Sequence, residues 1–312
     1  MGIKNRLVKK NSRKDIIKIS SNSMTYPKVS IIILNWNNYE DTKECLLSLD
    51  KITYPNYEVI VVDNGSEGND AVILEEQYKD YINVIRNKEN LGFAKGNNIA
   101  IKQVLKEWKS DYILLLNNDT VVEPDFLERL IEIGEEDESI GILGPKIYFY
   151  NTPNIIQCFG GKINLWLGRT PGIGFGKKDG SRYQKNRLAD SVSGAAMLIK
   201  KDVIQKVGLF DEKIFLYWED ADYYMRVRKQ GWKIMAVSSS HVYHKGQSSI
   251  PNPVFWYFIT KNNRYFMKKH THFYQLLTFY PIYFFTVLLR IIRLLKARHF
   301  KCIPFLVRGF LE

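Results

Sequence analysis

The sequence is short of cysteine and lacks any secretory signal. It has three cysteines in 312 residues, Cys45, Cys158 and Cys302, which are odd in number and far apart. This pattern indicates reduced thiols and a cytoplasmic chain rather than a disulfide framework. No apolar segment follows the basic amino terminus, so no secretory signal is expected.

Acidic residues are scarce at both ends of the chain. Residues 1–18 hold seven lysines and arginines against one acid, and residues 241–312 hold eleven against one. The net charge of +12 therefore lies at the ends, while the middle of the chain is mildly acidic. A nucleic-acid-binding domain more often carries its charge on the folded body, so no nucleic-acid partner is expected. Basic ends beside an aromatic, aliphatic tail favour an anionic membrane surface.

The clearest structural signal is a run of five apolar residues, 112–116. A hydrophobic content of 45% and an aromatic content of 13% exclude a disordered polyelectrolyte. The run predicts a strand buried on both faces, and the polar cluster that ends in Asp119 follows it directly. In an open α/β sheet the ligand crevice lies outside the carboxyl ends of the strands. Asp119 is therefore a candidate for holding a divalent cation, and a polar turn that caps the next helix is the alternative.

Strand-like and helix-like segments alternate through the first half of the chain. We expect strands at 29–34, 58–62, 82–86 and 112–116, with helices at about 39–50 and 69–79, after 90, and after 123. This alternation predicts an α/β fold with a mostly parallel, helix-covered sheet.

The second half of the chain has a different amino-acid composition. Glycine, proline and aromatic residues from 141 to 176 indicate irregular strands and loops over a cleft, and 177–190 is expected to be a mobile polar loop. Further elements are expected as a strand at 191–200, a helix that the stretch 215–222 leads into and that runs to about 230, and a strand at 233–237. Three parts are therefore predicted: a basic, flexible arm (1–26), a globular domain (27–250) and a C-terminal helical extension (251–312).

Five motifs occur in an order that resembles family 2 glycosyltransferases over about residues 28 to 250. They are Val61–Ser66 (VVDNGS), Asn90–Ala94 (NLGFA), Leu116–Asp119 (LNND), Ser193–Ala195 (SGA) and Trp218–Asp222 (WEDAD). The chain is most similar to the rhamnosyltransferase-like branch that builds bacterial surface polysaccharides. The resemblance implies a GT-A fold, with a Rossmann-like, nucleotide-binding half and an acceptor half. It also implies a nucleotide-sugar donor, Mg²⁺ or Mn²⁺, inversion at the anomeric carbon, and a glycan or lipid-linked acceptor.

The departing diphosphate gains negative charge, so a metal bridging its oxygens stabilises the reaction. By the resemblance Asp119 matches the last acid of the family's DxD motif, but the first position here is Asn117. One motif charge fits weakly held Mg²⁺ or Mn²⁺ with ligands from the diphosphate and water. His244 matches a histidine that reaches the metal or diphosphate in some relatives; His241 is its neighbour, and a surface histidine is the alternative.

The donor would lie at the ends of the first strands. Asp63 follows a strand and is expected to accept hydrogen bonds from the base or ribose, with an Asx turn as the alternative. Asn35 should line the same pocket, together with Asn64 and with Asn118 beside the metal ligand. Lys95, near a helix start, is expected to meet the diphosphate, unless it is an exposed helical lysine.

The acceptor hydroxyl must lose a proton to a carboxylate. Asp220 and Asp222 cannot both face it from one regular helix, because residues two apart point about 200° away from each other. Asp220 matches the family's catalytic acid and is predicted to be the base. Asp222 would orient the acceptor or pair with Arg226. The acceptor side is expected to comprise five residues: Gly194, Ala195, Trp218, Glu219 and Asp222.

Two other functions compete with a sugar transferase. A sugar-nucleotide pyrophosphorylase would need a glycine-rich loop after the first strand, and residues 35–38 contain no glycine. A non-catalytic nucleotide-sugar or polysaccharide-binding scaffold would not need Asp63, Asp119 and Asp220 together. The QxxRW motif of processive members is absent from the sequence, which favours the addition of one or a few sugars. dTDP-rhamnose or a UDP-sugar is the expected donor.

The tail is expected to lie on a membrane. Residues 273–289 contain no charge and are rich in Phe, Tyr and Leu, and five basic residues follow by 301. Seventeen residues are at the lower limit for a spanning helix. Tyrosines along the segment and basic residues at its end suit the headgroup boundary. The expected location is therefore peripheral, on the inner face of the cell membrane, with a buried C-terminal helix as the alternative.

Overall fold

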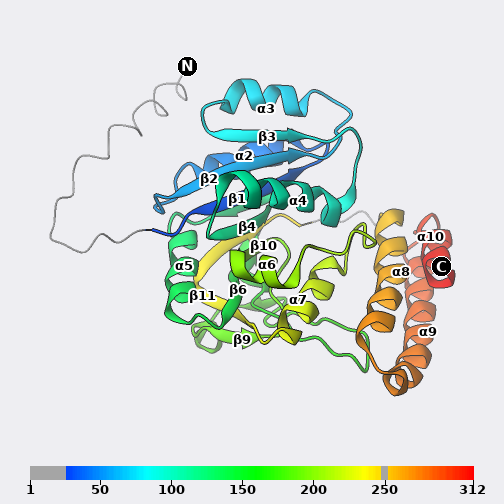
Figure 1. The fold of residues 1–312 in the computed structure, drawn as a ribbon. Helices are drawn as coiled ribbons and strands as arrows, with labels where there is room; N and C mark the ends of the chain where they lie inside the picture. Colours follow the sequence, from blue (N-terminus) through cyan, green and yellow to red (C-terminus); the bar gives the residue numbers. More distant parts are fainter. Residues whose placement is uncertain (1–25, 247–251) are drawn as a thin grey trace, which may run out of the picture.

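A computed structural model describes residues 26–246 and 252–312. Figure 1 shows a twisted sheet with helices on both faces and a separate group of C-terminal helices at one end. The basic arm predicted for residues 1–26 lies outside the described residues except for Tyr26, so its flexibility stays a prediction. The α/β fold class is confirmed.

One eleven-stranded sheet organises the chain, with the main order β3-β2-β1-β4-β10-β6-β11-β5. The first four neighbours are all parallel, as predicted, whereas β10 is antiparallel to both β4 and β6. The strands are β1 (Val29–Asn35), β2 (Tyr57–Asp63), β3 (Ile82–Arg86), β4 (Tyr112–Asn117), β5 (Thr120–Val122), β6 (Ile140–Phe149), β7 (Thr152–Cys158), β8 (Lys177–Lys178), β9 (Arg187–Ala189), β10 (Ala196–Lys200) and β11 (Lys233–His244).

Each face of the sheet has its own core, because successive side chains of a strand point to opposite faces. Ile31 and Leu114 belong to the face covered by α2, α3 and α5, and Ile32 and Leu115 belong to the face covered by α4, α6 and α7. The covering helices are α2 (Tyr39–Leu49), α3 (Asp70–Tyr78), α4 (Gly92–Gln103), α5 (Phe126–Glu136), α6 (Lys201–Val207) and α7 (Glu219–Lys229), with a π-helical turn (Val104–Trp108) after α4 and a 3₁₀ turn (Ser181–Tyr183).

The second half is more regular than its composition indicated. The prediction of irregular strands and loops for 141–176 is correct only in part. Residues 140–149 form the ten-residue strand β6, nine of whose residues are buried, whereas its pairing with β7 has register shifts. Gly141 and Gly144 fit because Val203 and Val192 leave no room for a Cβ at those positions. The predicted loop at 177–190 contains β8, β9 and a 3₁₀ turn. The strand predicted at 191–200 begins only at Ala196.

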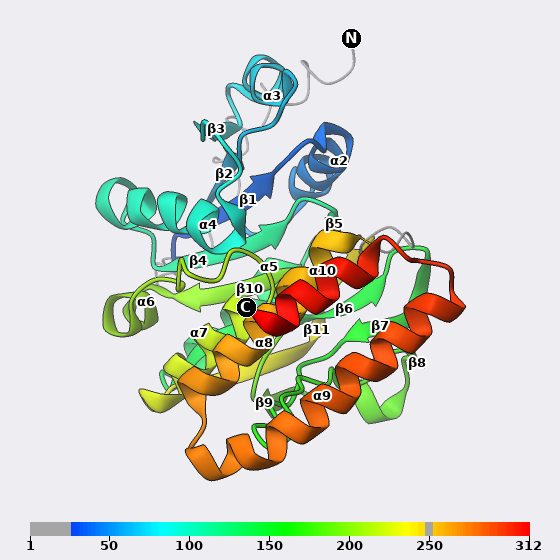
Figure 2. The ribbon, with the colours of Figure 1, turned by 90° about the vertical axis from the view of Figure 1, so that its right-hand side faces the viewer.

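Three helices follow the sheet: α8 (Pro253–His270), α9 (Phe273–Lys296) and α10 (Cys302–Leu311). Figure 2 shows them as a layer in front of the second half of the sheet. Their buried side chains form a third core with Trp218, Ala221 and Met225 of the α7 region. The helical character of the extension agrees with the prediction. Because α8 packs on α7, the extension is attached to the sheet domain by its first helix.

Candidate active site

The carboxyl ends of β1 and β2 hold a buried polar network. Asn35 and Asp63 are register partners, and the Asn35 Nδ2 donates to Asp63 Oδ1 at 3.0 Å. Ser66 Oγ donates to the same carboxylate at 2.5 Å, and Thr42 Oγ1 donates to Asn35 Oδ1 at 2.7 Å. Asn118 Nδ2 donates to Thr42 Oγ1 at 3.0 Å, which connects the end of β4 to this network. The structure therefore brings Asn35, Asp63 and Asn118 together at one edge of the sheet.

Asn64 and Lys95 have different surroundings. The Asn64 side chain is buried. Its amide group forms hydrogen bonds with the side chains of Asn87 and Asn90 and with the backbone of Leu91 and Gly92. These bonds fix the loop that begins α4, so the side chain stabilises that loop. Lys95 is exposed in the first turn of α4, close to the helix amino terminus, where anions bind favourably.

Asp119 and His244 meet at the carboxyl end of β4. The His244 Nε2 lies 3.1 Å from Asp119 Oδ1, and both side chains are largely buried. His244 Nδ1 lies 2.7 Å from Gln157 Oε1, which can only accept a hydrogen bond. Nδ1 therefore carries the proton and, in the neutral ring, Nε2 presents a lone pair beside the carboxylate. His241 lies elsewhere, with its ring edge-on to Tyr148 and Nε2 at 3.0 Å from Ser238 O.

These two side chains fit a divalent cation as adjacent ligands. Ligand atoms at about 2.1 Å in adjacent octahedral positions are about 3.0 Å apart, close to the 3.1 Å that separates Asp119 Oδ1 from His244 Nε2. Among the described residues no group of three or more histidines, cysteines or acids gathers around a single point. The protein would thus supply two ligands, and the remaining positions would be open to diphosphate oxygens and water.

A chain of contacts connects this region to Asp220. Ala195 O accepts a hydrogen bond from Asn117 N at 2.9 Å, and the preceding residue, Gly194, lies against the Asp220 carboxylate. A Cβ at Gly194 would meet Asp220 Oδ2 at 3.3 Å, so the absence of a side chain keeps the carboxylate accessible. Asp220 also lines a cavity of about 90 Å³ with Cys158, Gly161, Thr170, Gly172, Ser191, Val192, Ala221 and Tyr224.

The electrostatic surroundings of Asp220 favour a base. Its carboxylate is half-buried, and burial raises its pKa above the usual value for aspartate. None of the described residues forms an ion pair with it. Its carboxylate accepts hydrogen bonds from backbone N–H groups, with Ala221 N at 2.7 Å from Oδ1. Glu219 is buried beside it, and burial together with repulsion from Asp220 raises the Glu219 pKa well above its usual value. A carboxylate with a raised pKa is a stronger proton acceptor than an exposed one.

The turn before Asp220 is strained and held from two sides. Tyr217 and Trp218 have φ of 64° and 76°, a region that costs non-glycine residues of order 1–3 kcal/mol each. On one side Phe93 N donates to Phe215 O at 2.8 Å. On the other, Asn262 Nδ2 of α8 donates to Leu216 O and Tyr217 O at 2.8 and 3.2 Å. The first helix of the extension thus positions the turn that presents Asp220.

Asp222 occupies a different environment from Asp220. Its side chain is fully buried and contacts Arg226, Lys269 and His270 at 2.7 to 2.9 Å. Burial by itself would raise its pKa, but hydrogen bonds from His270 and Lys269 and the charge of Arg226 outweigh it and lower the pKa to about 2. The predicted pairing with Arg226 is present, as one of three such contacts. Trp218 also packs toward α8, with its Nε1 donating to Ile259 O at 3.2 Å.

Sequence reasoning missed Gln157 and Asn262, and it missed Lys269 and His270, the two partners that α8 gives to Asp222. Gln157 lies in β7, within the stretch expected to be irregular, and no motif marks it. Asn262 and His270 lie on α8, which no sequence pattern connected to the turn before Asp220. Only the knowledge that α8 packs on α7 could have indicated Asn262 and His270.

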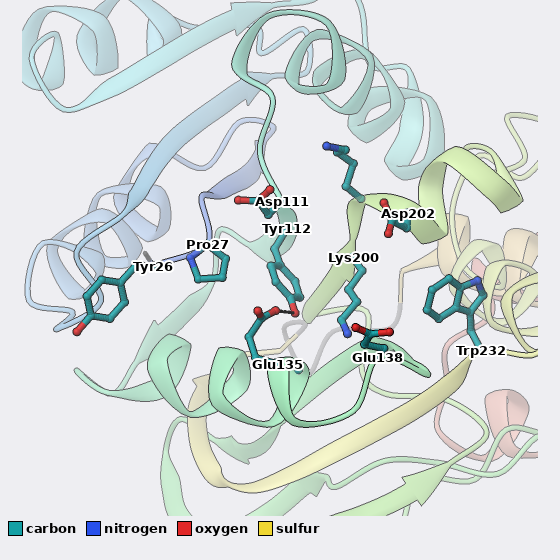
Figure 3. A pocket seen from close by; sticks show the side chains of 11 residues that line it. Tyr26, Pro27, Asp111, Tyr112, Glu135, Glu138, Lys200, Asp202 and Trp232 are labelled. Carbon is teal, nitrogen blue, oxygen red and sulfur yellow. Dashed lines mark hydrogen bonds between the residues drawn. The ribbon is translucent and has the colours of Figure 1, made fainter. Parts of the chain in front are cut away.

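A pocket of about 630 Å³ lies away from these residues. Figure 3 shows Asp111 and Tyr112 on its wall, with Glu135, Glu138 and Lys200 nearby. Asp111 and Tyr112 are at the amino end of β4, opposite the edge where Asp119 follows the strand. Ligands of open α/β sheets bind at carboxyl ends, so this pocket is not the candidate active site.

Comparison with known proteins gives relatives among sugar transferases. A relative from Mycobacterium tuberculosis, N-acetylglucosaminyl-diphospho-decaprenol L-rhamnosyltransferase, is 26% identical over 232 residues, which cover 67% of this chain and 73% of the relative. The O-antigen biosynthesis protein RfbC of Myxococcus xanthus is 26% identical over 247 residues, 74% of this chain but 18% of that protein.

Solved structures share the fold. GalNAc-T7, crystallised with UDP, GalNAc and Mn²⁺, has a TM-score of 0.63 at 17% identity, and S. aureus TarS has 0.53 at 19%. The alignments cover 78% and 76% of this chain but only 48% and 39% of those chains. The family description "Glycosyl transferase family 2" matches residues 30–208, more than half of the sequence. The chain therefore belongs to glycosyl transferase family 2, with a GT-A fold, and is an enzyme of the transferase class.

Proposed function

We propose that this enzyme moves one sugar, with inversion, from a nucleotide-diphosphate sugar to a hydroxyl of a lipid-linked acceptor. The observation that carries the proposal is the chain of contacts from Asp119 and His244 through Asn117, Ala195 and Gly194 to Asp220. It connects a candidate cation site to an unpaired carboxylate with a raised pKa. A transferase needs both groups at one edge of the sheet, one on each side of the reacting carbon.

In the proposed reaction the acceptor oxygen forms a bond to the anomeric carbon while the bond from that carbon to the diphosphate oxygen breaks. The bonding electron pair leaves with the nucleoside diphosphate. The acceptor proton passes to a carboxylate oxygen of Asp220. Asn35 and Asp63 would hold the nucleotide, and Lys95 at the amino end of α4 would meet the diphosphate. Bound Mg²⁺ or Mn²⁺, held by Asp119 and His244, would neutralise charge that develops on the diphosphate.

The relatives support particular substrates. The mycobacterial relative is named for L-rhamnosyl transfer to a diphospho-lipid, and GalNAc-T7 was crystallised with UDP and Mn²⁺. On this basis dTDP-rhamnose is the first donor to test and UDP-sugars are the second. The family match favours a transferase over the pyrophosphorylase and scaffold alternatives.

The variant Asp119→Ala tests the proposed function and the cation site in one experiment. In Mn²⁺ the wild-type protein is expected to gain thermal stability with its nucleotide sugar and to release nucleoside diphosphate slowly, because a ligand that binds only the native state stabilises it. Asp119→Ala is expected to bind the donor about tenfold or more weakly in Mn²⁺, by analogy with other losses of metal-site side chains. In chelator, both proteins should bind equally weakly. The measurement is a thermal-shift titration with each nucleotide sugar.

Glu138→Ala is the matched control, because Glu138 is an exposed acid in the distant pocket and its loss changes the net charge equally. It should behave as wild type. Equal weakening of Asp119→Ala in metal and in chelator would show that Asp119 does not hold the cation. Failure of every nucleotide sugar to bind or be hydrolysed would reject the proposed function itself.

A membrane-peripheral location is the second part of the proposal, and α9 supports it. Among the described residues α9 alone is long and apolar enough to cross a membrane, and 17% of its apolar window is buried. Phe279, Tyr283, Val287 and Leu294 are buried within the helical layer. Ten other apolar side chains of the helix are exposed: Phe273, Tyr274, Leu277, Tyr280, Phe284, Phe285, Leu288, Leu289, Ile292 and Leu295. An exposed apolar surface of this kind indicates a membrane or protein contact, and the basic surroundings favour an anionic lipid surface.

The double variant Phe285→Glu with Leu289→Glu is expected to lose binding to anionic vesicles. Both side chains are exposed, by 61% and 55%, so the fold should tolerate the change. Each large apolar side chain that enters an apolar phase contributes about 1.5–3 kcal/mol. Loss of two such contributions should therefore reduce vesicle partitioning at least about tenfold. Flotation with phosphatidylglycerol vesicles at low salt measures it.

Leu188→Glu provides the control, because Leu188 is 56% exposed in β9, outside the C-terminal helices. This variant should float like the wild type. The membrane proposal fails if the double variant floats equally well, or if the wild-type protein does not float at all.

A further inference from the structure

Three arginines at the edge of the helical layer have no acidic partner. Arg290 of α9 is half-buried, with its guanidinium 5.7 Å from the Trp256 ring centre. In the described part of the chain, the guanidinium groups of Arg290, Arg169 and Arg293 form no side-chain hydrogen bond or ion pair. The only acid after residue 240 is Glu312, which is paired with Lys261 and Arg308.

The charges of Arg169 and Arg293 both act on Arg290. The pKa of Arg290 lies below its usual value, because burial disfavours the charged form and the charges of Arg169 and Arg293 repel it. A partly buried charge without a compensating partner is unfavourable, and neighbouring like charges increase the cost. An anion bound to this cluster therefore stabilises the folded protein.

The cluster adjoins the catalytic cavity. Arg169 ends a tight turn in which Asn164 and Arg169 exchange backbone hydrogen bonds at 2.9 and 3.3 Å. The next residue, Thr170, lines the cavity that contains Asp220. The preceding residue, Gly168, is held by Asn263 of α8, whose Nδ2 donates to its carbonyl at 2.8 Å. The turn therefore reaches from the candidate base to the helical layer.

On its other side the cluster adjoins the exposed apolar surface of α9. Phe285 and Leu289 lie eight and four residues before Arg293, on the same side of the helix, and are 61% and 55% exposed. Guanidinium groups bind phosphate oxygens through paired, charge-assisted hydrogen bonds. An apolar surface next to them suits a hydrocarbon chain. Together these features match a diphosphate that is esterified to a lipid.

We propose that Arg169, Arg290 and Arg293 bind the diphosphate of a lipid-linked acceptor, whose hydrocarbon chain lies along the exposed surface of α9. This inference rests on the proposed function for the identity of the ligand as acceptor. The sugar attached to the diphosphate is then directed along the Arg169 turn toward Asp220. The site differs from the donor site, because the donor diphosphate belongs beside Asp119 and Lys95.

Binding of farnesyl diphosphate tests the site without sugar transfer. The full chain is titrated with farnesyl diphosphate in the presence of a chelator, and calorimetry measures the binding. The chelator excludes metal-dependent binding at Asp119. The wild type is expected to bind farnesyl diphosphate more tightly than farnesol or inorganic pyrophosphate. Arg169→Gln and Arg290→Gln should each weaken this binding about tenfold, the effect of losing a charge-assisted hydrogen bond.

Two further variants control for charge and for folding. Lys296→Gln removes one positive charge from the exposed last turn of the same helix and should bind as the wild type does. Arg169 is exposed in its turn, so Arg169→Gln reports on binding even if Arg290→Gln disturbs the contact with Trp256. Arg290→Lys, which keeps the charge but not the paired geometry, should recover only part of the affinity.

The outcomes separate this site from its alternatives. Equal binding of farnesyl diphosphate by the wild type and both glutamine variants overturns the proposal. Arginine-dependent binding of phosphatidylglycerol vesicles, without binding of farnesyl diphosphate, also overturns it in favour of a headgroup contact. If nucleotide sugars bind and farnesyl diphosphate does not, this inference fails and the proposed function stands. If farnesyl diphosphate binds through the arginines and no nucleotide sugar binds, the site stands and the proposed function fails.

Discussion

Asp220→Asn is expected to lower sugar transfer about 10²–10⁴-fold, the contribution of a positioned general base. The amide keeps the shape of the side chain but cannot accept the proton of the acceptor hydroxyl. Donor affinity should stay unchanged, because the candidate nucleotide residues Asn35 and Asp63 lie at the ends of β1 and β2, whereas Asp220 lies on α7. Steady-state transfer and a thermal-shift titration with the donor measure the two properties separately.

The same variant is expected to fold at least as stably as the wild type. The raised pKa of Asp220 means that the folded state disfavours its charged form at neutral pH. Removing this charge should therefore leave the free energy of unfolding unchanged or slightly higher. In the wild type, protonation of Asp220 should remove activity on the acidic side, at a pH above the ordinary aspartate value of 3.8. A variant that retained more than about a tenth of wild-type turnover would exclude Asp220 as the base.

The first half of the fold was predictable because its signals are local. Four parallel strands lie within one or two residues of the predicted ranges, since each is a short apolar run between turn residues. Asp63 and Asp119 follow such runs, so their placement at one sheet edge needed only the rule for carboxyl ends. Asp220 came from a motif and not from periodicity, and its role stays a prediction.

The second half was less predictable because its strands depend on partners far away in the sequence. β6 pairs with β10, β7 and β11, and its glycines are required by side chains from other elements. Composition alone made this strand resemble a loop. The contact of Asn262 with the strained turn also joins residues more than 40 positions apart. No sequence pattern records such a pairing, so the role of α8 required the structure.

Asp222→Asn is expected to have the opposite effect from Asp220→Asn, although the two residues are two positions apart. Asp222 is fully buried among Arg226, Lys269 and His270. Removing one partner of a buried ion cluster leaves uncompensated charge and costs about 3–5 kcal/mol. In a chain of this size the loss should lower Tm by about 10 °C. Thermal unfolding at pH 7 measures it.

The pH dependence of stability gives an independent check on Asp222. Its pKa falls from 3.8 to about 2 on folding, which corresponds to about 2 kcal/mol of stability. The sign follows because a lowered pKa means that the folded state favours the carboxylate. This contribution is complete above about pH 4 and is lost as the pH falls toward 2. Asp222→Asn should lack this part of the acid dependence, whereas Asp220→Asn should keep it.

The Asp222→Asn variant also distinguishes a structural from a catalytic role of Asp222, because α8 contacts both Asp222 and the turn before Asp220. If Asp222 joins α7 to α8, Asp222→Asn should lose stability first and retain substantial turnover per folded molecule at low temperature. The variant should still lose activity at acidic pH as the wild type does, since Asp220 is intact. A fully stable Asp222→Asn variant that had lost transfer would instead mean that Asp222 acts on the acceptor, as the sequence alone allowed. Measured side by side, the two asparagine variants would show which carboxylate accepts the proton and which joins the helices.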